Sequence, residues 1–379
     1  MIPTSIDPED VTPLWLDCDP GHDDAFAILI AAHHPSLKLL GITTIHGNAS
    51  LKNTTANAGS VLEAIGRPDI PVYPGSRKPF CRPAVHAPDI HGESGLDGTD
   101  LLPKARFPPV TDKNPILAMR DALLAEPKGK PWVVATGTLT NIALLFATFP
   151  EVAEHIQGLS IMGGAVGEEF TTAPMSRLPG EQSRIGNTTP FAEFNIYCDP
   201  EASESIFSNS VLAPKTFLIT LDLTHQVLAS TAIQDRILNG ASGHSESPTV
   251  LRQILHALLG FFSTTYATVF GLTTGPPLHD PLAVAIILSN LNPEFAKKHP
   301  RTALKFDDKG GERFAVKVVT DGQHGQDVSV TGQLGRTIAF PKEGHGVAIP
   351  RGVDLDGFWN LIDYCIQRAD ECNAARGVY

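Results

Sequence analysis

The stretch LWLDCDPGHDDAFAILIAAHHP, residues 14–35, places four aspartates between two apolar runs. Asp17, Asp19, Asp23 and Asp24 would repel one another if they were ionised and close together. LWLDC predicts a buried strand, the Pro-Gly pair predicts a sharp turn, and DDAFAILIAAHH predicts a buried helix. The aspartates therefore fall where a core strand turns into a core helix.

Two explanations of this acidic turn are open at this point. Acidic side chains favour the first turn of a helix, where free backbone N–H groups and the helix dipole lie, and this accounts for one or two aspartates. A hard cation held by oxygen ligands would turn the repulsion of all four into attraction. The sequence favours the metal site, with helix capping as the alternative.

The composition limits the class of protein. A chain of 379 residues with 42% hydrophobic content can bury a large core. The formal charge of −12 and the lack of a basic run argue against a nucleic-acid partner. Five cysteines without a C-x-x-C pair fit reduced thiols. The polar, proline-rich start does not read as a signal peptide, and the apolar stretches are too short for a membrane span. We expect a cytoplasmic protein that binds neither membrane nor nucleic acid.

Apolar strands alternate with helices through most of the chain. Strands are predicted at 14–18, 37–45, 132–136, 159–162 and 216–221, and helices at 23–34, 55–66 and 140–149. This alternation indicates an α/β fold with a mostly parallel sheet and helices on both faces. Later segments predict extra β hairpins (302–306, 314–320, 336–340) and a closing helix near 354–372. We expect one domain over 1–379, with an N-terminal extension at 1–13 and a loop insertion at 166–185.

Polar residues follow several of these strands. Ligands of an open parallel sheet bind outside the carboxyl ends of its strands. The polar segments there are HGN (46–48), TGTLTN (136–141), MGGA (162–165) and the pair Asp222 and His225. Two later segments, 186–202 and 276–285, add Asn187, Glu193, Asn195, His279 and Asp280. Taken alone, Asp280 fits a helix cap as well as a site residue, and His279 fits an ordinary partly buried histidine as well as a site residue. Together the set suits a hard metal and a polyhydroxylated ligand.

At these positions the chain resembles the nucleoside hydrolases, the inosine-uridine-preferring N-ribohydrolase family, and its pyrimidine-accepting branch such as the fungal uridine hydrolases. The matching motifs occur in order between about residues 14 and 290. They are D-x-D-P-G-x-D-D-A (17–25), T-G-x-L-T-N-I-A (136–143), I-M-G-G-A (161–165), G-N-x-T-P-x-A-E-F-N (186–195) and H-D-P (279–281). The C-terminal part adds little to the match.

The resemblance implies Ca²⁺-dependent hydrolysis of the N-glycosidic bond of ribonucleosides to ribose and a free base. The metal ligands that it implies are Asp19, Asp24, Asp280 and the main-chain carbonyl of Thr136, with Asp19 also the general base for a metal-bound water. The ribose contacts that it implies are Asp23, Asn48, Asn187, Glu193 and Asn195, with Met162 lining the same pocket. His279 and His91 match catalytic histidines near the leaving base. The resemblance also implies a homodimer or homotetramer.

The chemistry agrees with these residue types. Cleavage of the C1′–N bond builds positive charge on the ribose, as in other glycoside hydrolysis. Asparagines and a glutamate can fix the sugar hydroxyls. The leaving base must gain a proton or be stabilised as an anion, and a histidine is a suitable donor near neutral pH.

The base preference depends on fewer residues. Tyr266 and Phe270 are four apart, so they are predicted to share a face over the pocket as a mobile lid, whereas Phe261 and Phe262 are expected in the core. Two histidines near the base favour uridine. A purine-specific enzyme would place tryptophans around the wider ring, but the three tryptophans here are Trp15, Trp132 and Trp359, and the first two lie in predicted strands. The alternative is an inosine-preferring or broad-specificity enzyme.

Three other readings fit less well. A haloacid-dehalogenase-type phosphatase also begins with D-x-D, but the following Pro-Gly and the Asp23-Asp24 pair are not its continuation. The glycines of GGAVG (163–167) have the wrong spacing for the G-x-G-x-x-G of a dinucleotide-binding oxidoreductase. A non-catalytic nucleoside-binding protein would not need to retain the general base Asp19.

Overall fold

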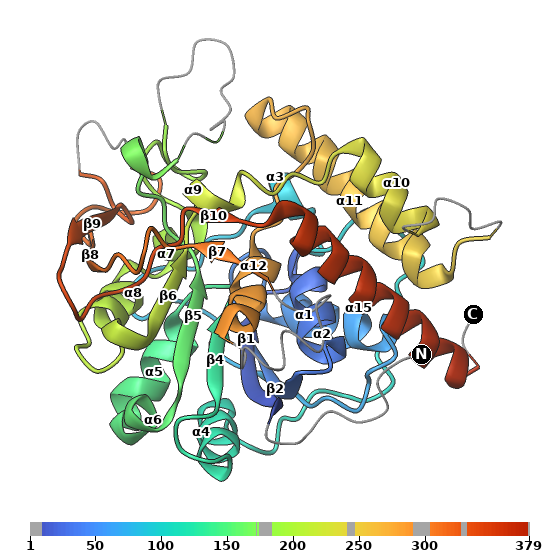
Figure 1. The fold of residues 1–379 in the computed structure, drawn as a ribbon, viewed down its shortest axis with the longest axis horizontal. Helices are drawn as coiled ribbons and strands as arrows, with labels where there is room; N and C mark the ends of the chain where they lie inside the picture. The colour runs from blue at the N-terminus through green and yellow to red at the C-terminus, as the bar shows by residue number, and fades with distance from the viewer. Residues whose placement is uncertain are drawn as a thin grey trace.

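The computed structural model describes residues 10–171, 173, 184–240, 247–290, 304–326 and 332–377. Its centre is a six-stranded parallel sheet with the strand order β3-β2-β1-β4-β5-β6 (Figure 1). The strands are β1 (Thr12–Cys18), β2 (Leu37–Thr44), β3 (Val72–Pro74), β4 (Trp132–Ala135), β5 (Gly158–Met162) and β6 (Thr216–Ile219). From β1, the strands β2 and β3 follow toward one edge of the sheet, and β4, β5 and β6 follow toward the other edge, so the strand order reverses between β1 and β4. Such a switch point is where ligands of α/β sheets bind.

The sheet separates two hydrophobic cores. Along β1, Leu14 and Leu16 belong to one core and Trp15 to the other, because successive side chains of a strand point to opposite faces. In β4, Val134 and Val133 divide in the same way. Both faces are thus buried, which explains the continuously apolar strands.

Helices cover both faces of the sheet (Figure 1). One core takes its helical residues from α1 (Asp24–His33), α2 (Leu51–Ala64), α11 (Val250–Phe270), α12 (Asp280–Ala285) and α15 (Leu355–Ala375). The other takes them from α4 (Pro115–Ala125), α5 (Thr140–Thr148), α6 (Pro150–His155) and α8 (Pro200–Phe207). The remaining helices are α3 (Pro88–His91), α7 (Phe194–Cys198), α9 (Leu221–Thr224), α10 (Thr231–Asn239) and the 3₁₀ turns η2 (Glu168–Phe170), η3 (Ala213–Lys215) and η4 (Ile286–Asn290). All ten residues of α1 are buried, and α12 and α15 pack against it.

The predicted fold class is confirmed. All five predicted strands are present, although β6 ends at Ile219 because Leu221 already begins α9. β8 (Phe314–Val318) pairs antiparallel with β9 (Thr337–Pro341), and β7 (Phe306–Asp307) pairs antiparallel with β10 (Gly352–Val353). The closing helix is α15. No helix in the described ranges has the length and apolarity that crossing a membrane requires.

Candidate active site

A cavity lies at the carboxyl ends of the parallel strands. Of the fourteen predicted site residues, all but Asp19 and Asp24 line it. The twelve are Asp23, Asn48, His91, Thr136, Met162, Asn187, Glu193, Asn195, Tyr266, Phe270, His279 and Asp280. Asp24 lies directly behind the wall, since its Oδ1 accepts a hydrogen bond from Thr136 Oγ1 at 2.9 Å and its Oδ2 from Asn48 Nδ2 at 3.3 Å. Residues separated widely in the sequence thus meet at the switch point of the sheet.

A larger hollow of about 990 Å³ lies elsewhere, between α2 and residues 105–110. Its lining is mostly apolar, and among the described residues Asp69 is its single acidic member. That carboxylate is bound by Arg67. The chemistry of the site therefore belongs to the smaller cavity.

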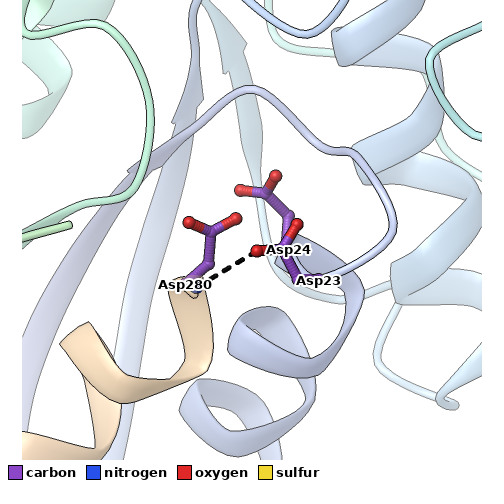
Figure 2. Close-up of side chains that lie close together, drawn as sticks. All are labelled: Asp23, Asp24 and Asp280. Carbon is purple, nitrogen blue, oxygen red and sulfur yellow. Dashed lines mark hydrogen bonds between the residues drawn. The ribbon is translucent and has the colours of Figure 1, made fainter. Parts of the chain in front are cut away.

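Three carboxylates converge on one wall of the cavity. Asp23 and Asp24 come from the start of α1, and Asp280 is the first residue of α12 (Figure 2). One oxygen of each lies within 4.8 Å of the others. Asp23 Oδ2 also accepts hydrogen bonds from the backbone N–H groups of His279 (3.1 Å) and Asp280 (3.3 Å). Asp23 thus caps the start of α12 instead of its own helix, so capping and clustering act together.

Asp19 is held beside this cluster with very little clearance. Its Oδ2 accepts a hydrogen bond from the Asn48 backbone N–H at 2.7 Å. Its Oδ1 is buried and has no hydrogen-bond partner among the described residues. A Cβ at Gly47 would lie 1.9 Å from Oδ2, and one at Gly137 would lie 2.5 Å from Oδ1. The Asp19 carboxylate therefore fits only because neither glycine has a side chain.

The cluster favours a bound cation. Burial, together with the charge of Asp24, raises the pKa of Asp23 to about 7. Burial also raises the pKa of Asp24, and it raises the pKa values of Asp19 and Asp280 well above their ordinary range. A cation would restore the ionised forms by opposing these effects. The donors are all oxygens, which suits a hard ion and not one that prefers nitrogen or sulfur ligands. The residues present therefore fit a metal such as Ca²⁺.

Asp17, the first aspartate of the motif, has a structural place. Its Oδ1 accepts a hydrogen bond from Asn141 Nδ2 at 2.8 Å and another from the Thr43 hydroxyl. These bonds join β1 to β2 and to α5. Burial raises the pKa of Asp17 to about 7. Asp17 thus stabilises the sheet and is not a member of the carboxylate cluster.

Amide and carboxylate groups form another part of the lining. Asn195 Nδ2 donates to the Thr136 carbonyl at 2.9 Å. Glu193 is the N-cap of α7, and it accepts from the backbone N–H groups of Gly164 (2.9 Å), Asn195 (2.9 Å) and Ile196 (3.1 Å). Its oxygens are thus already engaged by the backbone. Glu193 holds Asn195 in place as well as lining the cavity.

Aromatic rings and histidines form the remaining side. His279 Nδ1 lies 2.7 Å from Thr224 Oγ1, and its Nε2 lies 2.7 Å from the Tyr266 hydroxyl. The Tyr266 ring packs against Phe262 and Phe270, with ring centroids 4.7 and 5.0 Å apart. Burial lowers the pKa of His279 well below its ordinary value. The histidine is therefore neutral and takes part in a chain of hydrogen bonds.

Two residues of this region were missed by the sequence reasoning. Phe262 was expected in the core, yet it also lines the cavity. Its spacing of four from Tyr266 was the available signal, because such residues share a helix face. His22, in the opening motif, contacts His91, with 3.1 Å between their Nδ1 atoms. The sequence carried no signal for this pair, since 69 residues separate its members.

The predicted insertion at 166–185 is described in part, because 172 and 174–183 lie outside the described residues. At its start, the backbone N–H groups of Val166 and Gly167 donate to the Asp222 carboxylate at 2.8 and 2.7 Å. At its end, the Arg184 guanidinium lies 5.8 Å from the centre of the Phe270 ring. The end of the segment thus lies near Phe270, which lines the cavity.

The chain is similar to several known proteins. The sequence model described as inosine-uridine preferring nucleoside hydrolase matches residues 14–360. A uridine nucleosidase of Saccharomyces cerevisiae is 37% identical over 95% of this chain and 97% of its own. A pyrimidine-specific ribonucleoside hydrolase of Shewanella woodyi is 35% identical over 86% of this chain and 89% of its own. A solved structure of a purine-preferring ribonucleoside hydrolase from Gardnerella vaginalis superposes with a TM-score of 0.71 at 25% identity, covering 95% of this chain and 99% of that one.

Proposed function

The chain belongs to the inosine-uridine preferring nucleoside hydrolase family, and from this premise we propose that it hydrolyses uridine to ribose and uracil with the help of Ca²⁺. Membership makes it a ribonucleoside hydrolase. The observation that carries the finer proposal is a single cavity with buried carboxylates on one side and a histidine–tyrosine pair on another. The carboxylates suit the sugar and a metal, and the histidine–tyrosine pair suits the base.

In this proposal Asp19, Asp24, Asp280 and the Thr136 carbonyl hold the metal. The bound ion would lower the pKa of a water molecule and bind ribose hydroxyls. Asp19 acts as the general base, which its unpartnered Oδ1 supports, because this oxygen is free to take a proton. Asp23, whose capping bonds fix its carboxylate, contacts the ribose.

The ribose is fixed by groups from several parts of the lining. Asn48, Asn187 and Asn195 supply amides, and Glu193 and Met162 complete the pocket. Positive charge develops on the sugar as the C1′–N bond breaks, and a sugar already held in place loses less freedom in reaching that state.

The departing base meets His279, Tyr266, Phe270 and His91 in this proposal. His279 is hydrogen-bonded to Tyr266, and in this proposal the pair stabilises the departing base by hydrogen bonding as the bond breaks. Phe270 offers a flat apolar surface for the ring.

Uridine is the favoured substrate. The yeast and Shewanella relatives, whose names specify uridine and pyrimidine nucleosides, support this choice. Inosine is the alternative, because the structural neighbour from Gardnerella is titled purine-preferring.

The test is a comparison of kcat/KM for uridine, cytidine and inosine, with reducing sugar as the readout and calcium present. We expect uridine to be cleaved fastest and His279→Ala to slow it strongly. Faster cleavage of inosine would contradict the base preference, and release of ribose from none of them would contradict the proposed function.

We also propose a cytoplasmic homodimer or homotetramer. The five cysteines are free thiols, which suits a reducing compartment. Exposed Leu101 and Phe107 support an association surface. A single-chain mass by light scattering at micromolar concentration would contradict the assembly.

A further inference from the structure

His22 is packed between aromatic rings in the turn from β1 to α1. Its side chain is fully buried, and its ring lies nearly parallel to those of Phe261 and Phe262, with centroids 5.1 and 5.3 Å away. Its Nε2 lies 2.7 Å from the Asp97 carbonyl oxygen. A carbonyl oxygen can only accept, so His22 Nε2 carries the hydrogen of this bond.

The other ring nitrogen of His22 faces His91. The two Nδ1 atoms are 3.1 Å apart. Burial between phenyl rings favours the neutral imidazole, and a neutral ring with its hydrogen on Nε2 has a lone pair on Nδ1. His91 must then supply the hydrogen, because the alternative places two lone pairs against each other.

One contact opposes this arrangement. The backbone N–H of His22 points at His91 Nδ1 from 3.4 Å, and a bond there would need a lone pair on that nitrogen. This contact is at the long end of the range for N–H donors and weaker than the ring-to-ring contact at 3.1 Å. The shorter contact therefore decides the tautomer.

We propose that His22 is a positioning residue that fixes His91 as the Nδ1–H tautomer, so that His91 Nε2 accepts a hydrogen bond from the N3–H group of uracil. Nε2 is the ring nitrogen left for a ligand, and His91 lines the cavity. The identity of the base rests on the proposed function, whereas the tautomer does not.

The consequence is a means of recognising the base. Uracil attached to ribose has a single N–H group, at N3, and 3-methyluridine lacks it. A buried acceptor that loses its donor remains unpaired, which penalises the methylated substrate. His91 in this arrangement selects the base, while stabilisation of the departing base is left to the pair of His279 and Tyr266.

The tautomer can be observed directly by nitrogen NMR of the full-length protein labelled with ¹⁵N-histidine. The His91 signals are assigned by their loss in His91→Asn. We expect a protonated Nδ1 and an unprotonated Nε2 in His91, and the reverse pattern in His22. A hydrogen on Nε2 of His91 would overturn the proposal, even in an enzyme that cleaves uridine.

Kinetics test the effect on the substrate. His22→Phe keeps a buried ring but removes the acceptor, and we expect kcat/KM for uridine to fall about tenfold, as for one ordinary hydrogen bond. The value for 3-methyluridine should stay nearly constant. His22→Asn can place an amide oxygen where Nδ1 lay, so it should restore most of the preference for uridine.

His33→Phe is the matched control. His33 is also a buried histidine whose Nε2 meets a backbone carbonyl, that of Ile65, at 2.7 Å, but it lies at the far end of α1. We expect its removal to leave both kcat/KM values unchanged. Equal losses on both substrates in His22→Phe, without recovery in His22→Asn, would show a merely structural role and overturn the proposal. Absence of all nucleoside cleavage would reject the proposed function, while the NMR result would still decide the tautomer.

Discussion

At the scale of single residues, the position of Asp19 depends on the absence of side chains at two neighbouring positions, Gly47 and Gly137. One of its oxygens has a hydrogen-bond partner, and two glycines supply the space for the carboxylate. A side chain held by close packing is sensitive to the smallest addition, because protein interiors have few voids.

Gly47→Ala should therefore abolish most of the activity with a small effect on folding. The new methyl group would lie 1.9 Å from Asp19 Oδ2, so the carboxylate must rotate away. We expect kcat/KM to fall at least about 100-fold, as for other small displacements of reacting groups. Steady-state kinetics and a thermal melt of the same sample check this.

Gly260→Ala is the control for that change. No atom lies within 4 Å of a Cβ at this position in the middle of α11. The substitution should raise the free energy of unfolding by up to about 1 kcal/mol through helix propensity and leave the kinetics unchanged. Near-normal activity in Gly47→Ala would contradict the tight fit of Asp19.

Asp24→Asn should remove the metal. Both oxygens of Asp24 accept hydrogen bonds, from Gly21 N–H at 2.9 Å and from the Thr136 hydroxyl at 2.9 Å. An amide nitrogen in either place would face a donor and could not bind a cation. We expect elemental analysis to find calcium in the active wild type and none in the inactive variant. Zinc without calcium in active protein would contradict the assignment.

At the scale of elements, the short helix α7 depends on its N-cap residue, Glu193. Glu193 accepts three backbone N–H groups, two from α7 and one from Gly164 beyond β5. A carboxylate at a helix start both satisfies free donors and interacts with the helix dipole. This one side chain thus joins α7 to the sheet.

Glu193→Gln should lower the free energy of unfolding by about 2 kcal/mol, because one accepting oxygen and the negative charge are lost. Urea denaturation measures the change. The control is Glu151→Gln, an exposed residue in the first turn of α6, which should stay within about 0.5 kcal/mol of wild type. Equal effects of the two changes would show that Glu193 does not anchor α7.

The elements differ in how readily the sequence predicts them. β1, β2, β4, β5 and β6 follow from apolar runs, because strands buried on both faces need them. β3 has three residues and ends in a proline, so no run marks it. The pairing of β7 with β10 joins residues 306–307 to 352–353, and local patterns carry no signal for such distant partners.

The same distinction applies to the cavity. Eight of the twelve predicted residues that line it stand in compact motifs whose order could be recognised, whereas Asn48, His91, Tyr266 and Phe270 lie outside those motifs. The contacts between Tyr266 and His279 and between His22 and His91 depend on how α11 and α3 pack, which the sequence does not specify. Phe262 was assigned to the core, and it is indeed buried, but it also lines the cavity. Its apolar character alone gives no signal that separates these two roles.

At the scale of the whole molecule, a buried histidine couples stability to pH. Burial lowers the pKa of His33 from 6.5 to about 4. Between these pH values the unfolded chain binds a proton at His33 that the folded chain does not bind. The contribution of neutral His33 to the free energy of unfolding is therefore complete above pH 6.5 and declines as the pH falls toward 4.

His33→Gln should reduce this acid sensitivity, because an amide can keep the bond to the Ile65 carbonyl and does not titrate. Relative to the variant, wild type should lose about 2 kcal/mol of unfolding free energy between pH 6.5 and pH 5. Chemical denaturation of both proteins across this range tests it, and the difference between them cancels the other titrating groups. Parallel curves would contradict the low pKa.

The packing of α1 against α12 and α15 has a consequence for synthesis of the protein on the ribosome. The helix that carries Asp24 emerges before the segments that cover it, which include α12 and α15. A nascent polypeptide thus exposes an apolar helix beside an acidic turn until α12 and α15 have emerged. Chaperones that bind apolar segments have a target there until that point, and a product that lacks α15 retains that target permanently.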